Sequence, residues 1–482
     1  MQIVYWTQAS IINSVRIAFQ AQISGAASPQ ANHCFSRLLN VWRFSQCFPF
    51  TILLREGRCL KIVYPVCCGV DVHKKFFVAT LITTEGIEPK YKKRRFSTFN
   101  NQILEFKAWL LENDCRDVCM ESTGKYWVPV SNLLEDSINV TIANPKWVRA
   151  VKGCKDDEKD SKWIGDLFRI GIVPGSFIPS KDIRILREHT RYRFKLVSCK
   201  SSEKNRYQNV FTVCNVALDA VVSDMFGKSA SSITDYIVNS DTFDSEHCVS
   251  LLRGKLKKKA EDVVASIDGF QMEESQKNRA RMVREHYDYL VGQIINIDNA
   301  IGELAKPFES AINLMCTSPG IKRVSAINVL SEIGADMSQF ESSKKLCNWA
   351  GLAPGNNQSA GKKKSVHITR AGVYLKPALV EIAHAAVKDK KNPYYAIKYE
   401  RLRKRRGKKR AIIAIARMIL TAIYHMLSTG EVWNPVDLDQ IDMPPDLKEK
   451  EVQKSLVRAV KLLIAHGLIS PDAIKIPESV PA

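Results

Sequence analysis

The stretch VCCGVDVHKKFFVATLIT, residues 66–83, decides the fold expected for the first third of the chain. Valine, phenylalanine and threonine fill its two apolar runs, and a polar His-Lys-Lys tip separates them, which predicts two strands joined by a turn. A turn and a basic strand over residues 85–100 follow, and an apolar stripe over residues 100–114 is typical of a helix. Short strands then alternate with helices as far as residue 145, so the sequence predicts a mixed α/β sheet.

The composition of the 482-residue chain favours a nucleic-acid partner. Its length predicts about two to four domains. Lys and Arg outnumber Asp and Glu by 71 to 50, which gives a formal net charge of +21 and a pI of about 9.4. Such an excess of positive charge repels itself unless a polyanion neutralises it. A generically basic, soluble enzyme is the alternative.

The thirteen cysteines have no repeated spacing, and Cys115 and Cys119 come nearest to a ligand pair. Because structural zinc needs four converging ligands, we interpret the cysteines as buried, reduced thiols of a cytosolic protein. The sequence predicts no membrane span, because no apolar run reaches the roughly 18 residues that a span needs. No lysine-led signal peptide opens the chain.

The composition changes abruptly near Leu60. Residues 1–59 contain no Lys or Asp and one acid, Glu56, whereas the chain is rich in lysine from Lys61 onward. We expect the functional protein to begin near Leu60, after a mis-called start or a poorly ordered extension; a real accessory segment is the alternative. The predicted domains are an uncertain extension (1–59), an α/β catalytic domain (66–178), a region of long helices (179–310), a mainly α-helical C-terminal domain (311–430) and a tail (431–482) with one amphipathic helix (452–466).

Two patterns define the middle of the chain. Residues 180–226 are polar with helical periodicity, and residues 273–305 carry apolar side chains in steps of four and three: Val283, Tyr287, Leu290, Ile294, Ile297, Ile301 and Leu304. The steps predict a coiled coil or a long helical hairpin, with a single helix packed on its own domain as the alternative. Residues 318–334 have the sequence shape of a helix-hairpin-helix, whose turn and helix N-terminus suit a phosphate.

Four acidic residues are candidates for a metal site. Asp71 lies within an apolar strand, where a carboxylate is costly unless it is paired or binds a metal. Glu121 ends another strand, and Asp157 and Asp160, in KDDEKDSKWIGDLF (155–168), share one helix face. If the four converge, they suit hard Mg²⁺ ions, and two such ions about 4 Å apart activate a nucleophile and stabilise a leaving oxygen. Surface charge is the alternative that spacing alone leaves open.

A second constellation surrounds Ser359 in GNNQSAGKKKSVHITR (355–370). Cations beside a hydroxyl lower the cost of bringing a phosphate near, so this serine could attack phosphorus. A loop serine that only hydrogen-bonds DNA is the alternative. Candidates for salt-sensitive binding to nucleic acid, with a solvated basic face as the alternative, are Lys92, Lys93, Arg94, Arg95, Lys362, Lys363, Lys364, Arg370, Arg403, Arg405 and Arg406.

Four motifs occur in the order found in one known family: GVDVHKK, MESTGKYW, DDEKDSKWIGDLFRIG and GLAPGNNQSAGKKKSVHITRAG. Through them the chain resembles a DEDD-type transposase of the one-ten family of bacterial insertion sequences, over roughly residues 66–427. The resemblance implies an N-terminal domain similar to ribonuclease-H-like Holliday-junction resolvases, in which Asp71, Glu121, Asp157 and Asp160 bind Mg²⁺. It also implies a C-terminal transposase domain in which Ser359 is the nucleophile.

The resemblance further implies a recombinase that binds DNA under the guidance of a structured non-coding bridge RNA. Protomers, as dimers or tetramers, would join through the central coiled coil and combine acids and serine from different protomers. The expected location is the bacterial cytoplasm, at the nucleoid. Asp156 in place of Asp157, and Ser365 in place of Ser359, stay open, and Asp166 is expected to be a supporting or surface acid. A resolvase-like nuclease without a covalent intermediate and a non-catalytic scaffold are the rival functions.

Overall fold

The chain folds into two compact units that meet in sequence between Ser176 and Phe177. The computed structural model describes residues 62–86, 88–122, 124–148, 157–240, 242–354, 357–359, 362–365, 367–368, 372–437, 445–465 and 470. The extension over residues 1–59, Asp156 and Arg370 lie outside the described residues.

The N-terminal unit contains a five-stranded mixed sheet with the strand order β3-β2-β1-β4-β5. Its strands are β1 (Val66–Val72), β2 (Phe76–Glu85), β3 (Glu88–Ser97), β4 (Asp117–Glu121) and β5 (Asn139–Ala143). The first three strands are antiparallel, whereas β4 runs parallel to β1 and β5 parallel to β4. The prediction of two strands within residues 66–83 and of a mixed α/β sheet is therefore confirmed.

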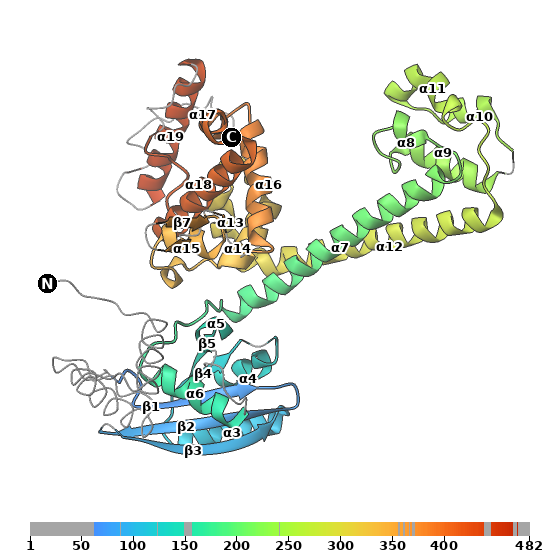
Figure 1. Ribbon diagram of the computed structural model, residues 1–482. Helices are drawn as coiled ribbons and strands as arrows, with labels where there is room; N and C mark the ends of the chain where they lie inside the picture. The colour runs from blue at the N-terminus through green and yellow to red at the C-terminus, as the bar shows by residue number, and fades with distance from the viewer. Residues whose placement is uncertain are drawn as a thin grey trace, which may run out of the picture. The chain divides into compact units, whose positions relative to one another are not determined.

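Helices cover both faces of this sheet (Figure 1). They are α3 (Asn100–Glu112), α4 (Trp127–Leu134), α5 (Pro145–Val148) and α6 (Asp157–Arg169). The α3 face is aromatic: Phe77 and Phe96 pack on Phe106 and Trp109 of α3, with ring centroids 5.1 to 5.8 Å apart. Residues alternate between the two faces of a strand, so the neighbours of Phe77 along β2 face α6.

The C-terminal unit begins with a hairpin of two long helices (Figure 1), α7 (Lys181–Thr212) and α12 (Glu274–Ala305). Each has 32 residues and is therefore about 48 Å long. Leu196 of α7 packs between Leu290 and Ile294 of α12. The apolar stripe predicted over residues 283–304 thus faces α7 within the same chain, as a helical hairpin does.

A small helical lobe connects the far ends of these two helices (Figure 1). It consists of α8 (Leu218–Val221), α9 (Lys228–Asn239), α10 (Ser245–Ser250), the 3-10 helix η1 (Gly254–Lys259) and α11 (Ala260–Ala265). Tyr207 and Phe211 of α7 join Ile233 and Ile237 of α9 in an apolar core of the lobe.

The remaining helices form a body around α18. Its elements are η2 (Lys306–Phe308), α13 (Glu309–Met315), α14 (Arg323–Ile333), η3 (Met337–Gln339), α15 (Ser343–Trp349), β6 (Asn357–Ser359), β7 (Lys362–Ser365), α16 (Leu375–Lys388), α17 (Tyr394–Arg406), α18 (Lys408–Thr429) and α19 (Pro445–Ala465). A turn through Gly320 joins α13 to α14, and α14 ends at Gly334, whereas the helix-hairpin-helix over residues 318–334 stays a prediction. The core extends to Trp433, and α19 begins at Pro445, earlier than the predicted residue 452.

Among the described residues, α18 is long and apolar enough to cross a membrane by length and composition alone, although no uninterrupted apolar run in it reaches 18 residues. Arg417 interrupts its apolar run without lowering the average enough to exclude the helix. The physical reason is that α18 is the central helix of the body, with Ile415, Ile419 and Ile423 fully buried. A core helix covered on several sides needs the same apolar composition as a span.

Candidate active site and nucleic-acid interface

Two of the four predicted metal-binding acids end adjacent parallel strands. β1 and β4 pair in a register that sets Val70 beside Met120, and one step further along this register Asp71 stands beside Glu121. Only 11% of the Asp71 side chain is exposed, and Glu121 is partly buried. Because neighbouring parallel strands end at the same edge of a sheet, the register sets two carboxylates side by side on one face.

Helix α6 approaches this face unusually closely. A Cβ atom on Gly69 would overlap the backbone of Ser161 and Gly165, so no residue but glycine fits at position 69 without a shift of the helix. Beside this approach, the hydroxyls of Thr80 and Ser161 hydrogen-bond at 2.8 Å, and both residues are fully buried. Gly69, Gly165 and this hydrogen bond fix the distance of α6 from the sheet and its position along β1.

The direction of α6 brings its first turn to the acidic end of β1. The carbonyl of Arg169, at the end of α6, accepts hydrogen bonds from the backbone N–H groups of Val63 and Tyr64, just before β1. Ser161 and Gly165 lie over Gly69, two residues before Asp71. Two strand residues span about 7 Å and four helix residues about 6 Å. The helix start at Asp157 is therefore level with Asp71.

Asp157 begins α6, and Asp160 is partly buried within its first turn. The side chain of Asp157 lies outside the described residues, and within the described part of the chain no three acidic, His or Cys side chains converge to hold a metal ion. Asp166 serves the fold, since it accepts from the Tyr91 hydroxyl at 2.9 Å and pairs with Lys162 at 3.2 Å.

The donor set nevertheless fits a hard divalent cation. Asp71 and Glu121 are carboxylates set beside each other by register, and α6 adds acids at the same end of the sheet. Mg²⁺ prefers such oxygen ligands. Asp71, Glu121, Asp157 and Asp160 are thus compatible in chemistry and in backbone position, although the described side chains alone do not complete a site.

His73 and Phe76, which were not predicted as site residues, belong to the same end of the sheet. Nε2 of His73 lies 3.0 Å from Oδ2 of Asp71, and the His73 ring packs on Phe76 with centroids 4.8 Å apart. Strand periodicity was a signal for His73, because residues i and i+2 of a strand share a face. The two residues extend the candidate site toward β2 and β3.

The predicted nucleophile stands on a hairpin of its own. β6 and β7 are antiparallel, and Ser359, the last residue of β6, pairs with Lys362, the first residue of β7. Ser365 pairs with Asn357 at the other end of the hairpin, next to an irregularity in the register. Ser359 therefore lies at the tip and Ser365 at the base. The side chains of both serines and of Lys362, Lys363 and Lys364 lie outside the described residues.

Contacts with α7 hold the chain that leaves this hairpin. The Arg191 guanidinium stacks on the Tyr374 ring at 4.6 Å and also donates two hydrogen bonds, at 2.7 and 2.8 Å, to the carboxylate of Glu332 on α14. Arg187 donates to the backbone carbonyls of residues 331 and 332. Burial lowers the pKa of Arg187 to about 10, so it stays charged at neutral pH. Two cations thus surround the buried Glu332.

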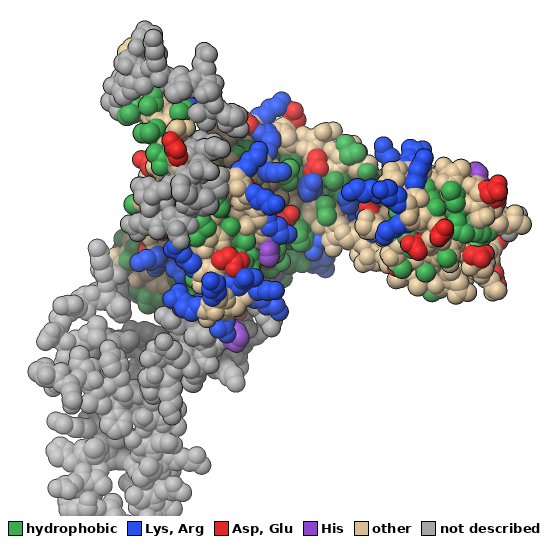
Figure 2. All heavy atoms as spheres, turned by 90° about the horizontal axis from the view of Figure 1, so that it is seen from above, with side chains coloured by type: hydrophobic (Ala, Val, Ile, Leu, Met, Phe, Trp, Pro, Cys, Tyr) green, Lys and Arg blue, Asp and Glu red, His purple; other side chains and the backbone are tan. Residues whose placement is uncertain are grey.

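The predicted basic residues fall into two groups with different surroundings. On β3, Lys92 donates to Asn113, Arg94 pairs with Glu105 at 2.9 Å, and Arg95 stacks on Phe76. On α17, Arg405 and Arg406 are exposed, as is Arg403, which pairs with Glu400. Lys and Arg side chains gather in several clusters on the face shown in Figure 2.

The exposed basic run continues from α17 into α18. Gly407 (φ 79°) ends α17 and lets α18 begin at once with Lys408, Lys409 and Arg410. Cations at a helix C-terminus are stabilising, but cations in the first turn of a helix oppose its dipole. The first turn of α18 therefore gains from a bound anion.

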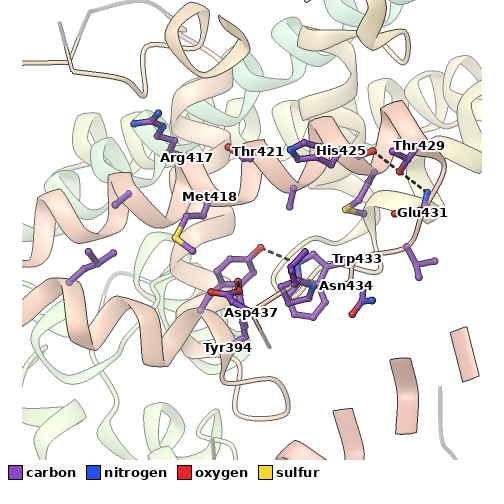
Figure 3. A pocket seen from close by; sticks show the side chains of 18 residues that line it. Tyr394, Arg417, Met418, Thr421, His425, Thr429, Glu431, Trp433, Asn434 and Asp437 are labelled. Atoms are coloured by element: carbon purple, nitrogen blue, oxygen red, sulfur yellow. Dashed lines mark hydrogen bonds between the residues drawn. The ribbon is translucent and has the colours of Figure 1, made fainter. Parts of the chain in front are cut away.

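A cavity of about 750 Å³ lies elsewhere, between α17, α18 and the segment before α19. Tyr394, Met418 and Trp433 line it (Figure 3). Trp433 donates to the Tyr395 hydroxyl at 3.1 Å, which fixes one wall. None of the site residues predicted from the sequence is among the described residues that line this cavity.

The cysteines of the sheet are buried, as expected. Burial raises the pKa of the Cys115 and Cys119 thiols to about 12. Among the described cysteines all are free thiols, and Cys199 on α7 is exposed.

Paired carboxylates at one edge of a mixed sheet, together with exposed basic runs on β3 and α17, are compatible with a protein that acts on nucleic acid. Two family comparisons specify the class. Residues 68–215 match the DEDD transposase family of IS110 type, described as a transposase, and residues 312–400 match the transposase family IS116/IS110/IS902. Over these two ranges the chain is similar to transposases of the IS110 type.

Two curated relatives are similar to part of the chain. The transposase for insertion sequence element IS1111A of Coxiella burnetii (strain RSA 493 / Nine Mile phase I) is 28% identical over 153 residues, or 30% of this chain and 42% of the relative. The pilin gene-inverting protein of Moraxella bovis is 29% identical over 149 residues, or 29% of this chain and 42% of the relative. The matches thus span less than half the length of either relative.

Proposed function

We propose that the protein is a transposase that cuts, exchanges and rejoins DNA strands, with a serine nucleophile and a divalent metal site. The observation that carries the proposal is the register that sets Asp71 beside Glu121, with the first turn of α6 level with Asp71. The relative named for inverting a pilin gene supports DNA rearrangement as the outcome. The strand order β3-β2-β1-β4-β5, with β4 and β5 parallel to β1, supports a ribonuclease-H-like domain.

Asp71, Glu121, Asp157 and Asp160 would hold Mg²⁺, which supplies a Lewis acid for the phosphate oxygens when bound. His73, hydrogen-bonded to Asp71, would orient that carboxylate. The buried position of Asp71 limits its freedom to rotate. The role of this chain's residues is thus to present acids in one preset arrangement.

Ser359 would attack the phosphorus of a DNA phosphodiester. The new bond joins the serine oxygen to phosphorus, the bond from phosphorus to the departing DNA oxygen breaks, and the serine proton ends on that oxygen. A hydroxyl of another DNA strand then reverses the step and releases the serine. Because the phosphoserine bond conserves the energy of the broken bond, rejoining needs no ATP.

The basic surfaces would bind the polyanion. Lys408, Lys409 and Arg410 at the start of α18 lower helix stability unless an anion is near, which supports a phosphate contact there. The N-terminus of α14 would offer backbone N–H groups for a further phosphate. A bridge RNA would supply sequence specificity by base pairing, so that protein residues contact backbone shape, as in other RNA-guided proteins.

Assembly completes the proposal. Protomers would join through the α7–α12 hairpin into dimers or tetramers, and acids and serine from different protomers would share one DNA. Its place of action would be the nucleoid of a bacterial cell.

One experiment tests the proposal. The protein is incubated with labelled DNA carrying an element end, RNA transcribed from the element's non-coding end, and Mg²⁺, and protein–DNA adducts are sought on a denaturing gel. Ser359→Ala should abolish adducts, and its matched control Ser365→Ala, at the base of the same hairpin, should retain them. Asp71→Asn should lower cutting by at least about 10³-fold while DNA binding persists.

Each contrary result has a distinct meaning. Adducts formed by Ser359→Ala would remove the proposed nucleophile. Cutting without any adduct would favour a resolvase-like nuclease, and tight binding without cutting would favour a scaffold.

A further inference from the structure

The two arginines at the end of the basic run on β3 face opposite sides of the sheet. Strand pairing aligns Asp71 of β1 with Val78 of β2, and Val78 with Arg95 of β3. The next row aligns Val70 with Ala79 and Arg94. Since paired residues share a face and successive residues alternate, Arg95 lies on the carboxylate face and Arg94 on the α3 face.

A continuous series of contacts joins Arg95 to Asp71. The Arg95 guanidinium lies 3.8 Å from the centre of the Phe76 ring, and the His73 ring packs on the same phenylalanine. His73 in turn lies 3.0 Å from Asp71. Phe76 is therefore a platform that holds a cation beside the acidic end of the sheet, since a guanidinium is attracted to the face of an aromatic ring.

The hydrogen-bonding capacity of Arg95 is unused. Within the described part of the chain, its exposed guanidinium makes the contact with Phe76 but no hydrogen bond or ion pair. Arg94 differs in both respects, because it donates to Glu105 at 2.9 Å and lies 5.7 Å from the centre of the Trp109 ring, both on α3. Arg94 thus fastens α3 to the sheet, whereas Arg95 presents free donors.

The chemistry of Arg95 suits a phosphate diester. A guanidinium offers paired N–H donors that match two phosphate oxygens. Two strand spacings separate Arg95 from Asp71, about 10 Å in the sheet. That span corresponds to about three base steps along the axis of a DNA duplex. A strand whose phosphate approaches the carboxylates is repelled by them, and a cation at this distance offsets the repulsion.

We propose that Arg95, held on Phe76, binds a phosphate of the DNA strand that enters the carboxylate site, and that Arg94 has no such role. The proposal deepens the proposed function and rests on it for the identity of the strand. Within the basic run of β3, Arg95 would thus bind the ligand, whereas Arg94 holds α3 to the sheet.

The test replaces single phosphates in a labelled duplex carrying the element end by neutral methylphosphonates, one position at a time around the cut. Binding to the full-length protein with its RNA is measured in metal-free buffer, and cutting is measured in Mg²⁺. For wild type we expect one position, within about three phosphates of the cut, at which neutralisation weakens binding about tenfold. Arg95→Ala should lose the same factor on natural DNA and become insensitive at that position.

Matched variants exclude a merely structural effect. Arg94→Ala should keep the sensitive position while lowering the melting temperature, and Arg95→Lys should recover part of the affinity because it retains the charge. In cutting assays Arg95→Ala should raise KM with little change in kcat, as loss of uniform substrate binding does.

The outcomes separate this inference from the proposed function. Equal sensitivity of wild type and Arg95→Ala at every phosphate would overturn the role of Arg95, as would loss of the sensitive position in Arg94→Ala. A sensitive position that depends on Arg95, in a protein that does not cut DNA, would support the phosphate contact and refute the recombinase.

Discussion

The acidic face of the sheet and the Ser359 hairpin are held by different kinds of packing. The acids stand at the ends of paired strands, under a helix whose backbone meets Gly69 directly. Ser359 stands at the tip of two strands of three and four residues. The base of that hairpin is held by one bridge, Pro354 to Ile368, and by Gly372 (φ +72°), where a Cβ would lie 2.6 Å from the Ala350 carbonyl oxygen.

This difference indicates how the acids of the sheet and the predicted serine nucleophile are each held in position. Close backbone packing in a sheet sets the acids in one arrangement before any substrate binds. Among the described residues, the chain at the base of the hairpin is positioned by these contacts and by the polar contacts of Arg191 with Tyr374 and Glu332. The acidic face and the hairpin are thus positioned by different parts of the chain, so the stability of each can be tested separately.

The largest expected effect is that of Gly69→Ala in the N-terminal unit. The added methyl group would meet the backbone of Ser161 and Gly165, which cannot rotate away, so we expect a loss of about 4 kcal/mol or more in the free energy of unfolding. Urea denaturation, with the hydrogen exchange of β1 as its readout, measures this loss of stability. Gly86→Ala is the control, because Gly86 has open space and only its positive φ opposes alanine, at about 1 to 2 kcal/mol. Equal losses for both variants would show that α6 does not fix the site.

Arg187, Arg191 and Glu332 form a clamp beside the chain that leaves the hairpin. Removal of this clamp should have the next largest effect. Glu332→Ala leaves Arg187 and Arg191 without their shared carboxylate, whose side chain is only 7% exposed. Breaking such a buried pair costs about 3 kcal/mol. Hydrogen exchange should rise in residues 372–376 and in α14 and stay unchanged in the sheet.

The matched control is Asp298→Ala, which removes the half-exposed partner of Arg193 on the same helix hairpin. An exposed pair contributes less than about 1 kcal/mol. If Asp298→Ala loosens residues 372–376 as much as Glu332→Ala does, the clamp does not anchor the hairpin's exit.

Sequence patterns predicted what depends on local periodicity. Alternation and β-propensity were enough for the strands around Asp71, and steps of four and three were enough for the face of α12 that contacts α7. The acids could be assigned to strand ends and to the start of a helix because each position is a local property. The match of Ser359 to a motif located it in a loop but gave no register.

The contacts that could not be predicted join residues far apart in the chain. Arg191 and Glu332 are separated by 141 positions, and the approach of Gly69 to Gly165 depends on how a helix lies over a sheet. Arg94 and Arg95 look alike in sequence, and only the pairing of β3 with β2 shows which of them lies on the carboxylate face. The apolar length of α18 has a similar cause, since the neighbouring helices that bury it come from distant parts of the chain.

The smallest expected effect is the pH dependence that the buried thiols of the sheet give to the free energy of unfolding. The folded-state pKa of Cys115 and Cys119 is about 12, above the ordinary thiol value of 9.0, because burial disfavours the thiolate. A raised pKa stabilises the fold fully below pH 9, and this stabilisation is lost as pH rises toward 12. At pH 9 each thiol should lower the free energy of unfolding by about 0.4 kcal/mol relative to pH 7.

Pulse alkylation across a urea series, read by mass spectrometry, measures this loss as a shift in the midpoint for Cys119 between pH 7 and pH 9. Cys199, exposed on α7, is the internal control and should react without urea, whereas thiols with a pKa near 12 should react about 10³-fold more slowly in the native state. Alkylation of Cys119 at the rate of Cys199 in native protein would mean that the sheet opens readily without urea, and an acidic face preset by close packing would be ruled out.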